Sequence, residues 1–387
     1  MTARSVTVVT GTRAEYGLLR SSMEHIVGRD DLALTTIVTG MHLTPQHGMT
    51  VQDIEDDGFH VSRRIHTEMV DDSGLGMAKG LGAAISGMAD AFGDLEPDIV
   101  LVLGDRGEAF AAAVAAAHMN VPVAHVHGGD AMEGATIDDS IRHALTKFAH
   151  LHFPASAQSR DRLLGLGEAE WRITLVGSPA LDAIRREEYT DSGSIREAFE
   201  IDPEDPLVVV VQHPVTTAPS KAGEQLATTL DAVTNHPEEP TVVVGYPNTD
   251  AGSARMVGVL ERFERSADVR TFRSVPRPDY LGLLATADVL VGNSSSGIIE
   301  APSFGLPVVD VGSRQAHRQR AANTVEVPHD VDAIRDAVGA ILSGDANVDR
   351  DGPYENPYDY GETGESIAAR LATVDLDEAL LQKELTI

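Results

Sequence analysis

The chain has 387 residues, of which 42% are hydrophobic, so at roughly 150 residues per domain it is long enough for two domains. It contains no cysteine, which excludes disulfides, thiolate metal ligands and a cysteine nucleophile. Its 60 acidic and 30 basic residues give a formal net charge of −30. So negative a surface repels the phosphates of nucleic acid, and we expect no nucleic-acid partner.

The sequence carries no export or membrane signal. No apolar stretch follows a basic N-terminal segment, and no run of 18 apolar residues occurs. We therefore predict neither a signal peptide nor a membrane span, and expect a cytoplasmic protein with no membrane partner.

The acidic residues are spread along the chain, and only four lysines occur. A dispersed excess of acids is typical of the hydrated surfaces of halophilic proteins. The alternative is an ordinary acidic bacterial protein. Either interpretation concerns the solvent and not the chemistry of a site.

The first half of the chain alternates apolar runs with helix-favouring stretches. Continuous apolar runs of this length are typical of strands buried on both faces of a parallel sheet. They predict strands at 5–11, 32–40, 98–105, 121–129, 150–156 and 172–179. Stretches rich in Ala, Leu and Met predict helices at 15–27, 75–93, 107–119 and 139–149. The alternation predicts a doubly wound α/β domain.

The second half repeats this scheme after a polar link at 186–194. Its predicted strands are 206–214, 240–248, 269–275, 287–297 and 306–313. A segment rich in Pro, Gly and Tyr at 349–366 precedes a last helical stretch near 364–384. We therefore predict two Rossmann-like halves whose strands end at one ligand cleft.

Polar clusters follow two strands of the first half. Arg13 and Glu15 stand where the first predicted strand gives way to a helix, and an arginine there can clamp a phosphate. A surface salt bridge at the helix start is the alternative. Asp105 and Arg106 follow the most apolar strand of this half, where Asp105 could also simply cap the next helix.

The densest polar segment spans residues 125–147. Its glycines allow a ligand to approach the backbone closely. His125 and His127 alternate along a strand, so they point to opposite sides and should not share a metal. The acids of its "TIDDS" motif predict caps for the helix from about 139, leaving either Asp138 or Asp139 for another role.

A fourth cluster consists of Ser294, Ser295, Ser296, Gly297 and Glu300. The serines and the glycine are expected to open a helix with Glu300 in its first turn. Backbone N–H groups there can bind an anion, and Glu300 can accept hydrogen bonds from ribose hydroxyls. The alternative is a serine N-cap with a capping-box glutamate.

Several nucleotide and metal motifs are missing from the sequence. It has no G-x-G-x-x-G after a strand and no Walker lysine motif, which disfavours NAD and P-loop chemistry. It has no H-E-x-x-H and no other paired-histidine spacing typical of a metal site. We therefore expect neither a metal nor a cofactor.

Together these segments resemble the hydrolysing UDP-N-acetylglucosamine 2-epimerase family, in its branch that supplies sialic and other nonulosonic acids. The matching segments follow the family order across nearly the whole chain: "TGTRAEYGLL", "TGMHLTPQHG", "LVLGDRGE", "AHVHGGD", "TIDDSIRHALTK", "QHPVTT", "YPNTDAGS" and the run from "RPDYLGLL" to "VDVGSRQ". The resemblance implies two Rossmann-like domains of the glycosyltransferase-B type with a cleft between them, and a C-terminal helix that crosses back. The corresponding domains are 1–182, 183–363 and 364–387.

The resemblance also implies roles for individual residues. The expected contacts to the UDP moiety are Arg13, His213, Ser294, Ser295, Ser296, Glu300 and Arg314. His42, Arg106 and Asn248 would lie around the sugar or its phosphates, and Asp105 and Asp138 would be catalytic carboxylates.

The sequence departs from the family pattern at His127, where many members have a catalytic glutamate. Either His127 takes over that role, or Asp130 or Glu133 reaches in from the turn at Gly128 and Gly129, called the glycine turn below. The loop from Asp130 to Asp138 is also slightly longer than in the mammalian-like members. The sequence of these segments is closer to the branch that acts on diacetylbacillosamine-type or other nucleotide-linked sugars in legionaminic acid synthesis.

The activity implied is conversion of UDP-N-acetylglucosamine, or a UDP-diacetylbacillosamine-type sugar, into UDP and the free 2-epimer of the N-acetylmannosamine type for sialic or legionaminic acid synthesis. Elimination of UDP followed by addition of water requires no redox cofactor. We expect a homodimer or homotetramer. The alternatives are a glycosyltransferase of the same two-domain type with a nucleotide-sugar donor, and a non-catalytic nucleotide-sugar sensor.

The charge balance predicts that salt controls stability. Because acids outnumber bases twofold, lowering the ionic strength should strengthen repulsion between carboxylates and destabilise the fold. We expect the melting temperature to rise between millimolar and molar KCl. A melting temperature that stays constant over this range would contradict the prediction.

Overall fold

The computed structural model describes residues 3–387 except 46–47, 68–73, 132–135, 216, 248–250, 268, 274, 346–353, 385 and 387. Contacts within the chain divide it into two compact units. Unit 1 comprises residues 1–130, 137–182 and 358–387, and unit 2 comprises residues 131–136 and 183–357.

Unit 1 is built on a parallel sheet with six strands among the described residues. They are β1 (Arg4–Thr10), β2 (Leu32–Thr39), β3 (Val61–Ile65), β4 (Ile99–Leu103), β5 (Val123–Val126) and β6 (Leu151–Phe153). The strand order is β3-β2-β1-β4-β5-β6. Every residue of β4 and β5 is buried, as expected for central strands that helices cover on both faces.

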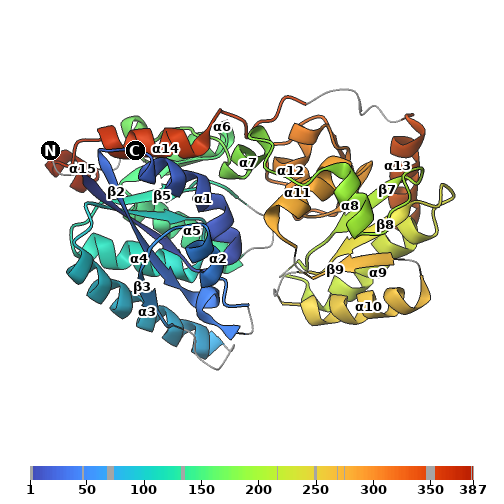
Figure 1. The fold of residues 1–387 in the computed structure, drawn as a ribbon, viewed down its shortest axis with the longest axis horizontal. Helices are drawn as coiled ribbons and strands as arrows, with labels where there is room; N and C mark the ends of the chain where they lie inside the picture. Colours follow the sequence, from blue (N-terminus) through green and yellow to red (C-terminus); the bar gives the residue numbers. More distant parts are fainter. Residues whose placement is uncertain are drawn as a thin grey trace. The chain divides into compact units, whose positions relative to one another are not determined.

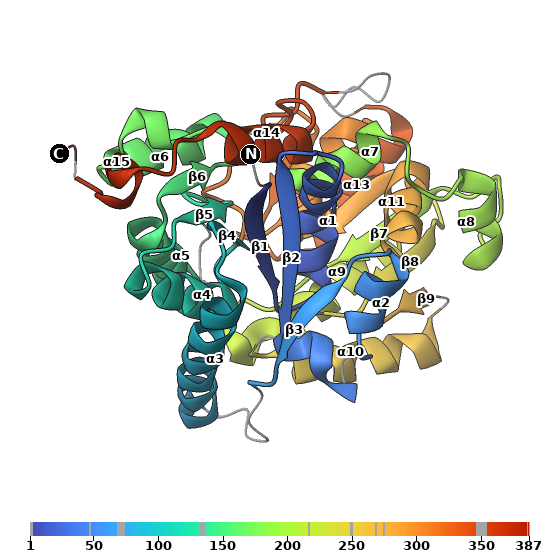
Figure 2. The ribbon, with the colours of Figure 1, turned by 60° about the vertical axis from the view of Figure 1, so that its left-hand side comes forward.

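Helices cover both faces of this sheet (Figures 1 and 2). The helices of the unit include α1 (Arg13–Val27), α2 (Val51–Asp56), α3 (Gly74–Leu95), α4 (Gly107–His118), α5 (Thr136–Phe148) and α6 (Ala157–Gly165). One core layer joins the sheet to α1 and α2, and the other joins it to α3, α4 and α5. Short 3-10 helices occupy Gly40–Leu43, Glu170–Arg172 and Pro179–Leu181, and α7 (Asp182–Arg185) follows.

Unit 2 has a second parallel sheet, also with six strands in its described part. They are β7 (Leu207–Val211), β8 (Thr241–Gly245), β9 (Val269–Phe272), β10 (Val289–Gly292), β11 (Val308–Val311) and β12 (Thr324–Val327). The strand order is β12-β11-β10-β7-β8-β9. The first and the fourth strand along the chain are therefore neighbours in both sheets.

One core layer of unit 2 joins its sheet to α9 (Ala222–Thr234), α10 (Ser253–Ser266) and α13 (Val331–Ser343). The other joins it to α8 (Ser192–Ala198), α11 (Arg277–Thr286) and the 3-10 helix Ala301–Phe304. Figure 1 shows α9 and α10 side by side along this unit. The four-residue α12 (Ser296–Ile299) and the 3-10 turn Pro219–Lys221 complete its helices among the described residues.

The chain returns to unit 1 through α14 (Thr363–Thr373) and α15 (Glu378–Leu381). In Figure 1, α14 lies beside α1, against which it packs. The buried carboxylate of Asp182 accepts the backbone N–H groups of Thr363 and Gly364, each at 2.9 Å. Asp182 thus supplies the N-terminal cap of α14 from a distant part of the chain.

A buried ion cluster fixes the end of the chain. Glu168 is 1% exposed and accepts hydrogen bonds from His152 and Lys147, each at 3.0 Å, and lies 2.6 Å from the Nζ of Lys383. Burial alone would raise the pKa of Glu168, but these donors outweigh it and hold the pKa at about 2. Arg172 adds hydrogen bonds to the carbonyl groups of residues 379, 380 and 382.

The structure confirms the predicted fold class and most of the predicted strands. The apolar run at 172–179 is not a strand: Ile173 forms an isolated bridge to His152, and the chain then reaches the 3-10 helix at Pro179. Two short edge strands, β3 and β12, were not predicted. Their half-exposed positions admit polar residues, which interrupt the apolar pattern.

Two helix predictions need correction. The helix expected from about 139 begins at Thr136, so Asp138 and Asp139 both lie inside its first turn. The single helix expected over 364–384 is broken after Thr373 and resumes at Glu378, because Asp377 caps a new turn. In the described part of the chain, no helix is long and apolar enough to cross a membrane.

The ion cluster predicts an acid-dependent contribution to stability. Replacing Glu168 by Gln leaves the partly buried ammonium of Lys383 without a carboxylate partner, so we expect the free energy of unfolding at pH 7 to fall by about 3 kcal/mol. Since the folded-state pKa lies below the ordinary value of 4.5, the contribution is present above that pH and is lost as the pH falls towards about 2.

Urea unfolding at several pH values measures this effect. The difference between wild type and Glu168→Gln should therefore narrow between pH 4.5 and about 2. The matched control is Glu170→Gln, whose carboxylate is 75% exposed and pairs with Arg160 at the surface. It should change the unfolding free energy by less than about 1 kcal/mol. Equal effects of the two substitutions would contradict the prediction.

Candidate active site

A buried arginine gathers acidic groups at the carboxyl edge of the unit 1 sheet. Arg142 of α5 has a side chain that is 3% exposed. It donates to the carboxylates of Asp105, after β4, and Asp139, in its own helix. It also donates to the backbone carbonyl of Asp130, after β5, at 3.1 Å. One guanidinium thus joins loops from two neighbouring strands to the helix that follows them.

Charge, rather than solvation, stabilises this arginine. Burial alone would lower the pKa of Arg142, but the nearby carboxylates of Asp105, Asp130 and Asp139 outweigh it and raise the pKa. The planar fork of a guanidinium can serve several oxygens at once. The sequence analysis missed Arg142, although its spacing of three from Asp139 places the two on one helix face.

Asp105 does not cap the helix that follows it. The N-cap position of α4 belongs to Arg106, and Asp105 pairs with Arg142 instead. The capping alternative for Asp105 is therefore wrong. Arg106 is itself close to carboxylates: burial alone would lower its pKa, but the charges of Glu108, Glu15, Asp105 and Asp138 raise it.

His127 and Asp130 lie together in the glycine turn after β5. His127 has a φ of 65°, a left-handed conformation that is rare for a residue with a side chain. Its Nδ1 lies 3.7 Å from Oδ2 of Asp130. His125 lies inside β5, is fully buried and bonds to the carbonyl of Gly104 at 2.7 Å. The two histidines therefore have separate surroundings. The expected alternation along one strand is nevertheless wrong, because β5 ends at Val126 and His127 lies in the turn that follows.

His42 is also fully buried, and threonines engage both of its ring nitrogens. Nε2 lies 3.1 Å from Oγ1 of Thr10, and Nδ1 lies 2.7 Å from Oγ1 of Thr50. Burial lowers the pKa of His42 to about 4, so the ring is neutral near pH 7. It therefore acts here as a neutral hydrogen-bonding group.

Two glutamates, the buried Glu15 and the partly exposed Glu108, lie beside the end of β1. Oε2 of Glu15 accepts the N–H of Gly11 at 2.9 Å. Burial, followed by the neighbouring charge of Glu108, raises the pKa of Glu15 to about 7. Glu108 packs so closely on Gly40, which has a φ of 55°, that a Cβ there would lie 2.6 Å from its Oε1. A carboxyl group that exchanges its proton near neutral pH therefore lies next to Arg106.

Arg13 begins α1 and remains accessible. Its guanidinium lies 3.3 Å from Oδ2 of Asp53, and the two side chains are 44% and 46% exposed. This is the surface salt bridge that the sequence analysis gave as the alternative. It is weak enough for a phosphate to displace the carboxylate.

Asn293 organises the corresponding edge of unit 2. Its side chain accepts from the N–H of His213 at 2.7 Å and donates to the carbonyl of the same residue at 2.9 Å. Its own carbonyl accepts from Arg314 at 3.1 Å and from Gln315 at 2.8 Å. The residue is 1% exposed and joins the loops after β7, β10 and β11. Burial, followed by the charge of Arg314, lowers the pKa of His213 to about 3.

The serine cluster has a different local structure from the one predicted. The helix α12 has four residues, and Glu300 is its C-cap instead of a first-turn residue. Pro302 favours the tighter 3-10 turn that follows. Ser294 accepts the N–H of Ser296 at 3.3 Å, so a serine does hold the start of this helix, but the capping-box role of Glu300 is wrong because Glu300 lies at the other end. Glu300 is buried and pairs with Arg277 at 2.6 Å.

Two further residues face this cluster and were not predicted. Arg277 begins α11 and holds Glu300. Tyr280, in the same helix, hydrogen-bonds Ser296 and Ser294, and burial raises its pKa to about 12. Ser296 and Gly297 are buried, whereas Ser294 and Ser295 are partly exposed. Asn248 lies outside the described residues.

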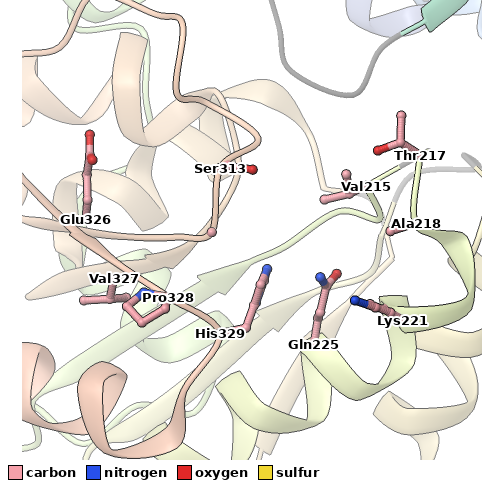
Figure 3. Close-up of a pocket in the computed structure, with 11 residues that line it drawn as sticks. Val215, Thr217, Ala218, Lys221, Gln225, Ser313, Glu326, Val327, Pro328 and His329 are labelled. Atoms are coloured by element: carbon pink, nitrogen blue, oxygen red, sulfur yellow. The ribbon is translucent and has the colours of Figure 1, made fainter.

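A pocket of about 640 Å³ opens beside these loops in unit 2. Figure 3 shows Lys221 and Gln225 from the start of α9 converging with His329, which follows β12, while Glu326 points away. Gly312 and Ser313 also line the pocket. They precede Arg314 in the sequence, so the loop after β11 forms part of the pocket wall. No group of three or more potential metal ligands occurs within the described part of the chain.

The chain matches a known protein family. The family model described as UDP-N-acetylglucosamine 2-epimerase matches residues 24–372. The chain belongs to this family. The resemblance inferred from sequence segments is therefore confirmed, and the chain is a nucleotide-sugar 2-epimerase of the hydrolysing kind.

Individual relatives agree with the family assignment. The chain is 37% identical to the UDP-N,N'-diacetylbacillosamine 2-epimerase (hydrolyzing) of Legionella pneumophila, over 98% of each chain. It is 33% identical to the GDP/UDP-N,N'-diacetylbacillosamine 2-epimerase (hydrolyzing) of Campylobacter jejuni, over 84% of this chain and 85% of that one. The fold matches the UDP-GlcNAc 2-epimerase of Neisseria meningitidis with a TM-score of 0.82 and 17% identity, over 95% and 99% of the two chains.

The ion pairs of Arg142 predict that this 2-epimerase needs a guanidinium at that position. Arg142→Lys keeps the charge but cannot span Asp105, Asp139 and the carbonyl of Asp130 together. We expect turnover of nucleotide sugar to fall by roughly tenfold or more. Arg160→Lys, at a surface pair on α6, is the control and should retain turnover. Equal turnover of the two variants would show that the guanidinium geometry is dispensable.

Proposed function

We propose that the enzyme converts a UDP-linked 2-acetamido sugar into UDP and the free 2-epimer, with a UDP-diacetylbacillosamine-type sugar as its substrate. The observation that carries the proposal is the cluster of Asp105, Asp130 and Asp139 around Arg142 at the edge of the unit 1 sheet. The identity of 37% to a diacetylbacillosamine epimerase over 98% of each chain supports the choice of sugar. UDP-N-acetylglucosamine is the second candidate, since the Neisseria structure was determined with that molecule bound.

The reaction proceeds in two steps that need acids, bases and an anion site. In the first, the C2–H bond breaks and its electron pair forms a C1=C2 double bond. The C1–O bond breaks in the same step, and its electron pair leaves with UDP. In the second, water adds its hydroxyl to C1. C2 receives a proton on the face opposite to the one from which the first proton was removed. Because the C2 proton is weakly acidic, departure of UDP runs ahead and positive charge builds at C1.

We assign the carboxylates of unit 1 to the sugar. Asp105 and Asp138 are the proposed catalytic carboxylates, and His127 with Asp130 replaces the family glutamate. Arg106, beside Asp105 and Asp138, is the proposed contact to sugar or phosphate. Developing charge in the transition state is stabilised by preorganised ions of this kind. Asn248 and His42 retain their proposed places around the sugar.

We assign the loops of unit 2 to the nucleotide. His213 and Arg314 are brought together by Asn293, so a cation and a neutral imidazole can face a diphosphate. The partly exposed Ser294 and Ser295 supply hydroxyl groups, and Ser296 with Gly297 supplies buried backbone. Glu300, held by Arg277, is the proposed acceptor for ribose hydroxyls. Arg13 is the proposed phosphate contact from unit 1.

A glycosyltransferase with a nucleotide-sugar donor is the alternative function. It would need a nucleotide site of the same kind, but it would pass the sugar to an acceptor and leave C2 untouched. The acidic cluster around Arg142 favours the epimerase, because inversion at C2 requires two proton transfers. A cytoplasmic location, a homo-oligomer and a salt-adapted surface stay predictions from the sequence.

Incubation at high salt with UDP-diacetylbacillosamine, UDP-N-acetylglucosamine and the GDP counterparts tests the proposal. We expect release of UDP and of the free 2-epimer without any acceptor, fastest with the diacetylated sugar. In D2O the product should carry one deuterium at C2, because that proton comes from solvent. Nucleotide release that requires an acceptor, or a product without deuterium at C2, would identify a transferase.

Two substitutions test the proposed nucleotide contacts. Arg13→Ala and Ser295→Ala should each weaken binding of UDP by about 1–3 kcal/mol, because each removes a polar contact to a charged group. Isothermal calorimetry measures the affinity. Ser266→Ala, in the last turn of α10, is the control and should leave it unchanged. Wild-type affinity in either site variant removes that residue from the nucleotide site.

A further inference from the structure

The glycine turn after β5 contains a second buried constellation besides the Arg142 cluster. It consists of His127, Asp130 and Ser159, which come from the turn and from the first turn of α6. Ser159 is 3% exposed, and the side chains of Asp130 and His127 are 7% and 12% exposed. A histidine and a carboxylate that are both buried in contact need a structural or a chemical reason.

The three side chains form a chain of polar contacts. Oγ of Ser159 donates to Oδ1 of Asp130 at 2.6 Å. Oδ2 of the same carboxylate faces Nδ1 of His127 at 3.7 Å. That separation is within ion-pair range and longer than a hydrogen bond, as pairs of catalytic groups frequently are before substrate binds. The carboxylate therefore has protein groups at both oxygens, and Nε2 of the imidazole is buried at the other end of this chain of contacts.

The backbone is shaped to hold this arrangement. The N–H of His127 donates to the carbonyl of Phe153 at 3.0 Å, which fixes the left-handed turn to the neighbouring strand β6. A Cβ on Gly129 would lie 2.2 Å from the carbonyl oxygen of Ser159, so only glycine permits α6 to approach the turn this closely. Arg162 of α6 donates to the carbonyl of Gly129. Strain of this kind is retained where the position of a side chain matters.

We infer that Asp130 is the positioning residue of His127, that Ser159 holds Asp130, and that His127 is the group which exchanges a proton with the substrate. This inference rests on the proposed function. The carboxylate accepts the Nδ1–H of the neutral imidazole and thereby leaves Nε2 as the basic nitrogen. In the elimination step Nε2 takes the proton from C2, whose electron pair forms the C1=C2 bond as UDP leaves. The substitution of the family glutamate by histidine is thus matched by a partner carboxylate three residues later.

The amide variant of Asp130 gives a distinctive result. If Ser159 continues to donate to the side-chain oxygen, Asp130→Asn turns its NH2 group towards Nδ1 of His127. Nδ1 then becomes the acceptor, and the proton moves to Nε2, which can no longer act as a base. We expect kcat to fall by roughly 10²-fold or more while KM for the nucleotide sugar changes by less than about threefold. Ser159→Ala should lower kcat by roughly fivefold, in line with the loss of one hydrogen bond.

The experiment combines kinetics with ¹⁵N NMR of histidine-labelled enzyme, in which His127→Gln assigns the signals. The wild type should carry its proton on Nδ1 and Asp130→Asn should carry it on Nε2. Ser22→Ala is the matched control, because this serine of α1 is also fully buried and its hydroxyl has no hydrogen-bond partner among the described residues. It should leave kcat and the tautomer unchanged. Circular dichroism and the melting temperature establish that each variant is folded.

The outcomes separate this inference from the proposed function. Turnover by the wild type together with an unchanged tautomer and kcat in Asp130→Asn would overturn the inference and leave the function intact. Loss of activity in Asp130→Asn with near wild-type turnover in His127→Gln would also overturn it, since Asp130 would then be the base. Absence of epimerase activity in the wild type would overturn the function, whereas the tautomer measurement would still test the pair. Should Asp130→Asn not fold, Ser159→Ala decides by the same kcat and tautomer readouts.

Discussion

The order of strands in the two sheets is the constraint from which the functional geometry follows. In each sheet the first and the fourth strand along the chain are neighbours, and the chain continues from them in opposite directions across the sheet. The loops that leave such a pair diverge and cannot cover the strand ends between them. Arg13 and Asp105 follow one pair, and His213 and Ser294 follow the other. Polar residues can therefore remain accessible at the edge of a sheet whose strands are buried.

Two buried charges in this protein, Arg142 and Glu168, are matched by opposite charges at short range. Arg142 gathers acids from two loops and a helix, and Glu168 is contacted by two lysines and a histidine from three segments. The surface has the reverse composition, with twice as many acids as bases in the whole chain. Solvent and salt attenuate the repulsion among exposed acids, but they cannot do so for buried groups. Whether a charge is buried or exposed therefore affects its interactions more than the total number of charges does.

The sequence predicts the parts of this structure that depend on local periodicity. Buried central strands such as β4 and β7 are continuous apolar runs, and the helices between them follow composition. Edge strands escape detection because residues such as Arg63 and Glu326 face solvent. Side-chain contacts between distant segments are also invisible: neither the partnership of Arg142 with Asp105 nor the links from Asn293 to two other loops follows from spacing alone. The residue types at the edges could be predicted, whereas their partners depend on the fold.

The return of the chain to unit 1 has a consequence for synthesis on the ribosome. The core of unit 1 contains Ile367, Leu371 and Leu380, and Asp182 accepts hydrogen bonds from the N-terminus of α14. Roughly 200 residues must be translated after Asp182 before these contacts can form, which takes about 10–40 s at 5–20 residues per second. During that interval the apolar side of α1 has no partner from α14. Unit 2, whose segments are contiguous apart from a short stretch, can complete its core first.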